Sequence, residues 1–220
     1  MTQLDLKQGR AVYLIGLTGN IACGKSAVVN MLRQRGAFVI DADRVVHTLM
    51  EPGGTIYTPV VEVFGQNILA EAGPDGQPSG QPSGQRPIDR RKLGAIVFAD
   101  PQQLRRLEEI SHPRVRVEIT RLIRESSAAV IVLDAIKLLE NGLDQAADAV
   151  WVVTCPPEAQ LERLMRRNNF SREEALLRIN AQPPQAEKVA RASVVIDNGG
   201  SLAETERQVE VAWQQIPQSL

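Results

Sequence analysis

The sequence LIGLTGNIACGKS, residues 14–26, is an apolar run that ends in a glycine-rich turn and closes on Gly-Lys-Ser. Its last eight residues fit the phosphate-loop pattern, in which a glycine, four free positions and a second glycine precede lysine and a hydroxyl residue. They are Gly19, Asn20, Ile21, Ala22, Cys23, Gly24, Lys25 and Ser26. The glycines permit turns that point successive N–H groups inward, where amides and the N-terminus of the following helix hold an anion. The stretch therefore predicts a site for a nucleoside triphosphate.

Two residues of this loop have separate expected roles. Lys25 reaches the β and γ phosphates, and the Ser26 hydroxyl is placed to bind Mg²⁺, which is held mostly by phosphate oxygens and water. So short a pattern also arises by chance in a glycine-containing loop. The sequences on either side of it decide between a chance match and a nucleotide site. Residues 11–17 (AVYLIGL) predict a buried parallel strand, and residues 27–35 (AVVNMLRQR) place apolar side chains on one helical face. The loop thus has the strand and the helix that nucleotide binding requires.

The composition fits one α/β domain with smaller subdomains. The 220 residues include 43% hydrophobic and 23% charged side chains, enough for a substantial core. A formal net charge of -1 argues against a nucleic-acid-binding surface spread over the protein, so we expect small-molecule partners and no nucleic acid. No stretch approaches the roughly 18 apolar residues that cross a membrane. The residues before Ala11 contain no apolar core of the kind found in a signal peptide. We therefore expect a soluble, unprocessed protein without a membrane partner.

The two cysteines lack the spacing of a metal site. Cys23 lies inside the phosphate loop and Cys155 lies in VVTCPP, where a disulfide would disturb the nucleotide site. We expect reduced thiols and a cytoplasmic protein.

Further apolar runs predict more strands of the same sheet. Residues 37–43 (AFVIDAD) predict a strand that finishes in Asp41 and Asp43, and later strands are expected at 129–134, 149–154 and 194–196. A right-handed crossover brings the carboxyl ends of parallel strands to one edge, where open α/β sheets bind ligands. Asp41 and Asp43 are therefore expected near the phosphates.

Helices are expected between these strands. Residues 44–112 predict a helical insertion, in which Asp100-Pro101 starts a helix and His112-Pro113 interrupts it before a longer helix. The segment 73–87 repeats Gln-Pro-Ser-Gly and predicts an exposed loop without chemistry.

The last third of the chain predicts an arginine-rich helical hairpin and a closing helix. The hairpin opens at Pro156-Pro157, and Ser171 with Glu174 forms a capping box for its second helix. Its arginines are Arg163, Arg166, Arg167 and Arg178. The apolar side of the closing helix is expected to contain Leu202, Val209 and Trp213.

Together these motifs resemble the dephospho-CoA kinase family. The resemblance runs in order from about Tyr13 to Trp213 and is most distinctive at IDAD (40–43), EPGG (51–54) and VIDNGG (195–200). It implies a kinase with a phosphate loop that moves the γ-phosphoryl group of ATP, with Mg²⁺, to the ribose 3′-hydroxyl of dephospho-CoA and so completes coenzyme A. The implied fold is an α/β parallel sheet flanked by helices, with a helical CoA-binding insertion and a helical lid.

The resemblance also implies three regions, with ATP and dephospho-CoA as the substrates. Separately, we expect a monomer. The nucleotide-binding core comprises residues 1–43, 113–155 and 185–220. The CoA-binding region is 44–112, and the lid is 156–184.

Residue roles follow from the same match. Asp43 corresponds to the carboxylate that orients the acceptor hydroxyl and accepts its proton, with helix capping as the alternative. Asp134 resembles the carboxylate that organises Mg²⁺ through water, and helix capping is again the alternative. Arg163 and Arg167 share a helix face that closes over the phosphates or is merely solvated, and Arg167 is the expected catalytic member. Gln182 is expected at the adenine or the lid hinge, or in an ordinary turn.

One departure from the family and two other functions stay open. Lys137 stands where members have proline, and it is either solvated, in contact with a phosphate, or the mark of a divergent subgroup. A kinase of the same architecture acting on another nucleotide-like acceptor is one alternative function. A nucleotide-binding module without transfer is the other.

Overall fold

The computed structural model describes residues 4–71 and 85–217. The chain forms two compact units. The first comprises residues 1–41 and 122–220, and the second comprises residues 42–121. The repeated Gln-Pro-Ser-Gly segment, whose repeats occupy 77–84, lies outside the described residues.

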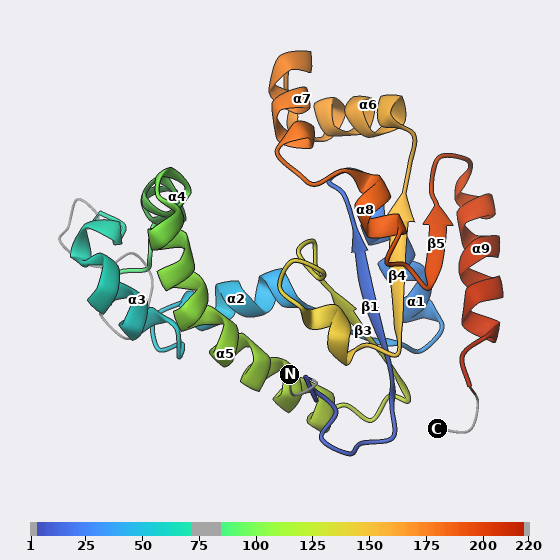
Figure 1. Ribbon diagram of the computed structural model, residues 1–220, viewed down its shortest axis with the longest axis horizontal. Helices are drawn as coiled ribbons and strands as arrows, with labels where there is room; N and C mark the ends of the chain where they lie inside the picture. The colour runs from blue at the N-terminus through green and yellow to red at the C-terminus, as the bar shows by residue number, and fades with distance from the viewer. Residues whose placement is uncertain (1–3, 72–84, 218–220) are drawn as a thin grey trace. The chain divides into compact units, whose positions relative to one another are not determined.

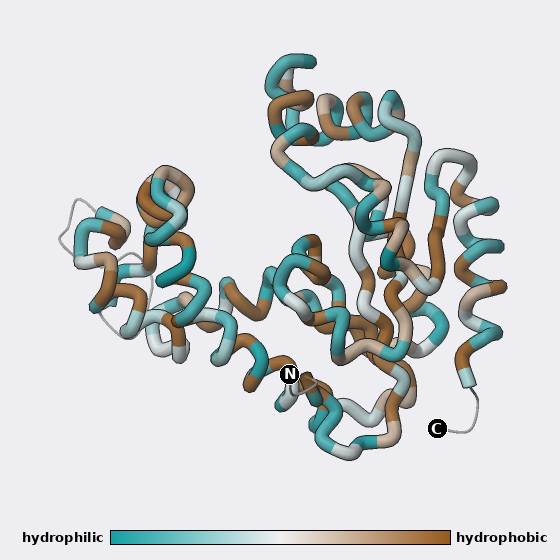
Figure 2. The backbone as a smooth tube through the Cα atoms, in the orientation of Figure 1, coloured by the Kyte–Doolittle hydropathy of each residue, from teal (hydrophilic) through white to brown (hydrophobic). Residues whose placement is uncertain are grey.

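The first unit is built on a parallel sheet with the strand order β2-β3-β1-β4-β5. The strands are β1 (Tyr13–Gly19), β2 (Phe38–Asp41), β3 (Val130–Asp134), β4 (Ala149–Thr154) and β5 (Val194–Asp197). β1, β3 and β4 are central and almost continuously buried, which explains their unbroken apolar sequences. In Figure 2 the helices alternate between hydrophobic and hydrophilic residues along their length. The α/β parallel sheet predicted from the sequence is confirmed.

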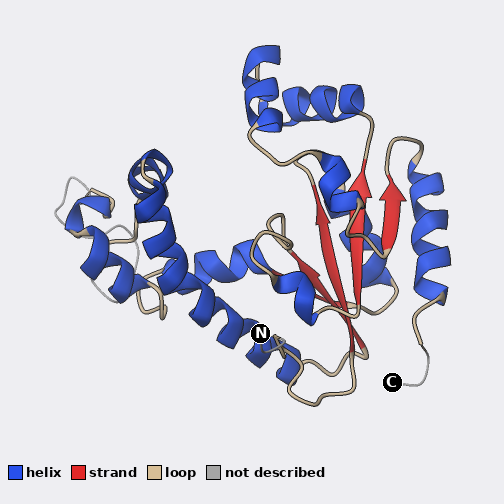
Figure 3. Ribbon diagram, viewed as in Figure 1, coloured by secondary structure: helices blue, strands red, loops and turns tan. Residues whose placement is uncertain are grey.

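Helices lie on both sides of the strands (Figure 3). Those of the first unit are α1 (Lys25–Gln34), α6 (Pro157–Asn168), α7 (Arg172–Asn180), α8 (Gln185–Val189), α9 (Leu202–Gln214) and the short 3₁₀ helix η2 (Leu143–Ala146). α1 and α9 pack on one face of the sheet, where Leu32 and Val209 join Val132 and Trp151 in the main hydrophobic core. Figure 1 shows α6 and α7 beyond the carboxyl ends of β1 and β4.

The second unit is helical. It contains α2 (Ala42–Met50), α3 (Tyr57–Phe64), the 3₁₀ helix η1 (Gln66–Ile68), α4 (Arg90–Ala99) and most of α5 (Pro101–Glu125). Asp89 caps α4 by accepting hydrogen bonds from the backbone of Arg91 and Lys92, and Leu69 and Ile88 form an isolated antiparallel bridge. No helix within the described ranges combines the length and the apolar content that a membrane crossing needs.

The expected break at His112-Pro113 is wrong, since α5 runs unbroken from Pro101 to Glu125. Proline removes one backbone donor from a helix and strains the preceding turn. Side chains add hydrogen bonds in the neighbouring turns, since the Arg114 guanidinium donates to the Ile110 carbonyl at 2.8 Å and the Ser111 hydroxyl donates to the Leu107 carbonyl at 2.6 Å. The expected start is confirmed, since the backbone N–H of Gln102 donates to the Asp100 carboxylate at 2.8 Å.

Two other expectations need correction. β2 ends at Asp41, so Asp43 lies in the first turn of α2 and not in the strand. Leu202 is 62% exposed and does not belong to the buried side of α9, because it is the first residue of that helix and Thr205 occupies the inward position of the first turn. The predicted capping box of Ser171 and Glu174 is confirmed.

Candidate active site

The phosphate loop joins the end of β1 to the start of α1. Its turn uses left-handed backbone at Ala22, with φ of 62°, and at Gly24, with φ of 88°. A Cβ atom at Gly24 would lie 1.9 Å from the side-chain nitrogen of Asn198, and one at Gly19 would lie 2.6 Å from the carbonyl oxygen of Val153. Gly24 is required both for its left-handed conformation and for its close contact with Asn198. Gly19 is required for close packing alone.

Polar groups of Gln160, Gln182 and Pro183 contact the middle of the loop. The Ile21 backbone N–H donates to the Gln182 amide oxygen at 2.8 Å, and the Gln160 amide donates to the Ile21 carbonyl at 2.8 Å. The Asn20 amide donates to the Pro183 carbonyl at 3.1 Å. Gln182 therefore supports the phosphate loop. Gln160 does too, and the sequence offered no signal for it because its partner lies 139 residues away.

Asn198 holds the end of the loop. Its side-chain amide donates to the Cys23 carbonyl at 2.9 Å, and its oxygen accepts from the Thr205 hydroxyl at 2.9 Å. The Arg163 guanidinium donates to the Asn198 backbone carbonyl at 2.9 Å. A second guanidinium nitrogen, Nη1 of Arg163, is buried beside Gly24 and has no hydrogen-bond partner among the described residues. Arg163 thus brings an unsatisfied donor to the loop.

The loop also makes apolar contacts with the helical hairpin α6–α7. Ile21 and Ala22 pack against a small cluster formed by Leu161, Leu164 and Ala175. This cluster ties the base of the hairpin to the phosphate loop. The same hairpin is stabilised at its tip by the Arg178 guanidinium, which stacks 4.0 Å from the centre of the Phe170 ring.

Lys25 and Asp134 form an ion pair inside the first unit. Asp134 ends β3 next to β1, and in the register of the sheet it lies opposite Leu17 on one side and Asp41 on the other. Ser26 follows Lys25 in the first turn of α1 and is exposed. The loop lysine and the carboxylate at the end of the central strand are therefore brought together.

A buried lysine that the sequence did not single out contacts the turn that follows Asp134. Lys188 in α8 is 2% exposed, and its ammonium group donates to the Ile136 carbonyl at 2.6 Å and lies 3.4 Å from the Thr18 hydroxyl. The Glu140 carboxylate is 3.5 Å from the same nitrogen. A charged, paired group in this position fastens the turn that follows Asp134 to the end of β1. Lys137, in the same turn, is exposed.

Two expected site residues take no part in these contacts. Arg167 is exposed one turn beyond Arg163, and its guanidinium donates to the side chain of Asn168 at 2.9 Å. Asp43 belongs to α2 of the second unit. It lies two positions after Asp41, the last residue of β2 in the first unit. Their roles stay predictions.

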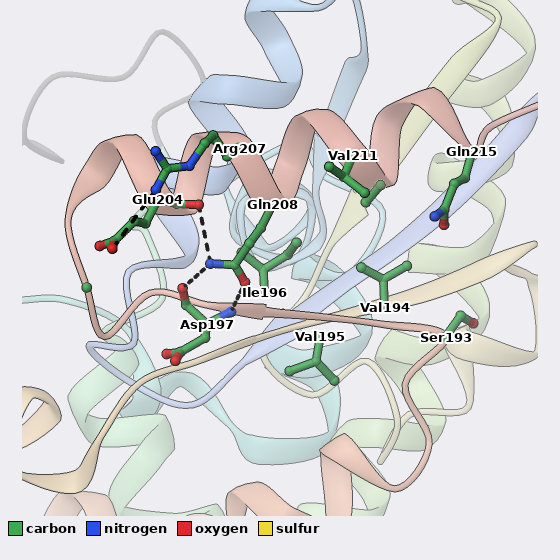
Figure 4. Close-up of a pocket in the computed structure, with 12 residues that line it drawn as sticks. Ser193, Val194, Val195, Ile196, Asp197, Glu204, Arg207, Gln208, Val211 and Gln215 are labelled. Carbon is green, nitrogen blue, oxygen red and sulfur yellow. Dashed lines mark hydrogen bonds and ion pairs between the residues drawn. The ribbon is translucent and has the colours of Figure 1, made fainter.

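A cavity of about 730 Å³ lies between β5 and α9 (Figure 4) and is lined by no residue of the phosphate loop. Within it, the Gln208 amide oxygen accepts from the Asp197 backbone N–H and its nitrogen donates to the Asp197 carbonyl, both at 2.8 Å. These bonds satisfy the backbone of Asp197 at the edge of the sheet. The cavity is distinct from the nucleotide loop.

The parallel sheet, the loop between β1 and α1, and the helical hairpin over the loop define an α/β protein with the fold of phosphate-loop kinases. Residues 13–204 match the sequence profile of the family described as dephospho-CoA kinase. The chain belongs to the dephospho-CoA kinase family, whose members are ATP-dependent kinases.

Curated relatives and solved structures agree with this assignment. The chain is 47% identical to a dephospho-CoA kinase of Carboxydothermus hydrogenoformans over 199 residues, covering 89% of this chain and 90% of the relative. It is 47% identical to one from Symbiobacterium thermophilum over 203 residues, covering 91% and 80%. A crystal structure of a Thermus thermophilus protein matches with a TM-score of 0.77 at 31% identity, covering 94% and 100%. A dephospho-CoA kinase structure from Campylobacter jejuni matches with a TM-score of 0.63 at 26% identity, covering 92% and 96%.

Proposed function

We propose that this chain transfers the γ-phosphoryl group of ATP to the ribose 3′-hydroxyl of dephospho-CoA, with the phosphate loop as the donor site. The observation that carries this proposal is the loop itself, held by Gln160, Gln182 and Asn198 and closed on Lys25. Dephospho-CoA is proposed as the acceptor because the similar curated proteins are named dephospho-CoA kinase. Phosphoryl transfer depends mainly on positioning and on neutralising charge, which a rigid loop with cationic side chains provides.

Two cations of the first unit are the proposed partners of the triphosphate. Lys25 exchanges its bond with Asp134 for the β and γ phosphates, and Nη1 of Arg163 donates to the nucleotide beside Gly24. Since that nitrogen is buried and unsatisfied, a ligand that accepts its hydrogen bond removes a cost of about 1–3 kcal/mol. Arg167, one helical turn further, is the proposed catalytic arginine that meets charge developing on the transferred group.

The residues at the loop fit Mg²⁺ as the metal. Ser26 supplies a hydroxyl and Asp134 a carboxylate, which are the hard oxygen ligands this ion accepts. Within residues 4–71 and 85–217 no group of three or more His, Cys, Asp or Glu side chains forms a cage, which suits an ion that keeps several waters and phosphate ligands. When bound, Mg²⁺ would neutralise charge on the phosphate oxygens.

We further propose that Asp43 orients the acceptor hydroxyl and accepts its proton. Residues 44–112 are the proposed CoA-binding region and residues 156–184 the proposed lid. The core then comprises 1–43, 113–155 and 185–220. A monomer in the cytoplasm is part of the same proposal, and the free thiols of Cys23 and Cys155 suit that compartment.

A coupled assay of ADP release tests the proposal. Dephospho-CoA is compared with nucleoside monophosphates as the acceptor, each with ATP and Mg²⁺. We expect turnover with dephospho-CoA, and analysis of the product should place the new phosphate on the 3′-oxygen. Turnover only with a monophosphate would show that the acceptor is another nucleotide, and ATP binding without turnover would show a binding module.

A further inference from the structure

The two cysteines of the chain meet at the phosphate loop. The sulfur atoms of Cys23 and Cys155 are 3.1 Å apart, although 132 positions separate them in the sequence. Both are free thiols, and their exposed fractions are 0% and 3%. Since the chain contains two cysteines, any disulfide within it joins this pair.

Contacts with neighbouring elements fix the positions of both cysteines. Cys23 precedes Gly24 in the loop, and its carbonyl accepts from Asn198. Cys155 directly follows β4, whose last residue is Thr154. The side-chain oxygen of Gln185 in α8 lies 3.4 Å from the Cys23 sulfur and 3.4 Å from the Cys155 backbone nitrogen. The short distance between the sulfurs is thus a property of the packed site.

The environment makes the two thiols unequal. The hydrogen bond between the two sulfurs lowers the pKa of the Cys155 thiol, and the nearby Arg163 guanidinium acts in the same direction. The same hydrogen bond, together with burial, raises the pKa of Cys23. Since the thiolate is the reactive form, Cys155 is the sulfur that reacts first and Cys23 is the one that resolves the product.

We propose that Cys23 and Cys155 form a reversible disulfide under hydrogen peroxide and that this bond switches off the nucleotide site. In the first step the Cys155 thiolate attacks one peroxide oxygen, the O–O bond breaks, and the leaving hydroxide takes a proton to become water. In the second step the Cys23 sulfur displaces the hydroxyl of the Cys155 sulfenic acid, which leaves as water with the thiol proton. Two thiols lose two electrons and two protons, and one peroxide becomes two waters.

The effect on nucleotide binding follows from the geometry of the loop and rests on the proposed function. A disulfide bond is about 2.05 Å long, so the sulfurs must approach by about 1 Å. Because Cys23 belongs to the loop, closing this distance shifts loop atoms from the positions that Asn198 holds. Displacement of a binding group by about 1 Å costs on the order of 10²-fold in catalysis. Burial also favours a small oxidant, so hydrogen peroxide should react much faster than oxidised glutathione.

The experiment treats the purified full chain with hydrogen peroxide, blocks free thiols with an alkylating agent, and measures intact mass and linked peptides. We expect the loss of two hydrogens, a peptide pair joined through Cys23 and Cys155, and return of both thiols with dithiothreitol. Two alkylatable thiols after treatment, or Cys155 oxidised to sulfinic acid without a link, would overturn the proposal. These readouts use the wild-type chain and do not depend on its acceptor.

Nucleotide affinity is measured on the same samples with a fluorescent ATP analogue. We expect oxidation to weaken binding at least about tenfold, in line with the displacement argument, and dithiothreitol to restore it. Cys155→Ala cannot form the bond, so peroxide should leave its affinity unchanged. A linked protein that binds ATP as tightly as the reduced one would overturn the switch. If only the dephospho-CoA assay fails, the proposed function is wrong and the switch still stands, since thiol state and ATP binding are measured without the acceptor.

Discussion

The side chain of Asn198 fills the space that a Cβ atom on Gly24 would need, with its amide nitrogen 1.9 Å from that position. The VIDNGG segment near the end of the chain therefore shapes the glycine-rich turn near its beginning. Asn198 also donates to the Cys23 carbonyl, so one side chain both excludes a side chain at Gly24 and holds the residue before it.

Gly24→Ala should destabilise the protein more than Gly36→Ala. Both glycines flank α1 with left-handed backbone, at φ of 88° and 91°, but no atom lies within 4 Å of a Cβ atom placed on Gly36. Gly36→Ala should cost about 1–2 kcal/mol for backbone strain, and Gly24→Ala an additional 1–3 kcal/mol, roughly, for overpacking. Denaturant unfolding measures both. Equal losses would show that Asn198 moves aside without cost.

Arg163→Ala and Arg167→Ala should affect different kinetic constants. Arg163 lies at the loop with a buried, unsatisfied nitrogen, so its loss should raise KM for ATP by about 10- to 100-fold, the equivalent of one hydrogen bond to a charged group. Arg167 is exposed, and its proposed role is confined to the transition state, so its loss should lower kcat by at least about tenfold with little change in KM. Steady-state kinetics separate the two effects. If Arg167→Ala keeps its kcat, the catalytic role of Arg167 is wrong.

Asp43→Asn should lower kcat by on the order of 10²- to 10⁴-fold while ATP still binds, because the amide cannot accept the proton of the acceptor hydroxyl. Asp41→Asn is the matched control, since Asp41 is the last residue of β2 and lies two positions earlier. It should have the smaller effect on kcat. An Asp43→Asn enzyme with normal turnover would remove this residue from the mechanism.

Lys188→Met should lower the free energy of unfolding by about 1–3 kcal/mol, since it removes a buried, charged donor from the Ile136 carbonyl and leaves that carbonyl with the Thr18 hydroxyl as its donor. Lys137→Met is the control, because Lys137 is exposed in the same turn. Substitution there should change stability by at most about 0.5 kcal/mol. The control also tests the function of Lys137: a raised KM for ATP would indicate phosphate contact, and unchanged kinetics would indicate a solvated side chain. Equal stability losses would contradict the structural role assigned to Lys188.

Elements that depend on neighbours in the sequence were predicted well. β3 and β4 follow from uninterrupted apolar runs, and the capping box of Ser171 and Glu174 follows from a spacing of three residues. The prediction at His112-Pro113 is wrong because the local cost of a proline is offset by the rest of a long helix, which the dipeptide does not reveal. The predicted second strand is too long because the sequence of residues 37–43 gives no sign that α2 starts at Ala42.

The sequence by itself determined the nucleotide loop, the class of fold and the family. These rest on patterns in which a few adjacent residues meet a local requirement, such as glycine where a turn is left-handed or an apolar run where a strand is buried. Only the tertiary structure decided what holds the loop. Gln160, Gln182 and Asn198 reach it from 139, 161 and 175 positions away, and Cys23 meets Cys155 across 132. No local pattern encodes such pairs, because they arise when packing of the sheet and its helices brings distant segments together.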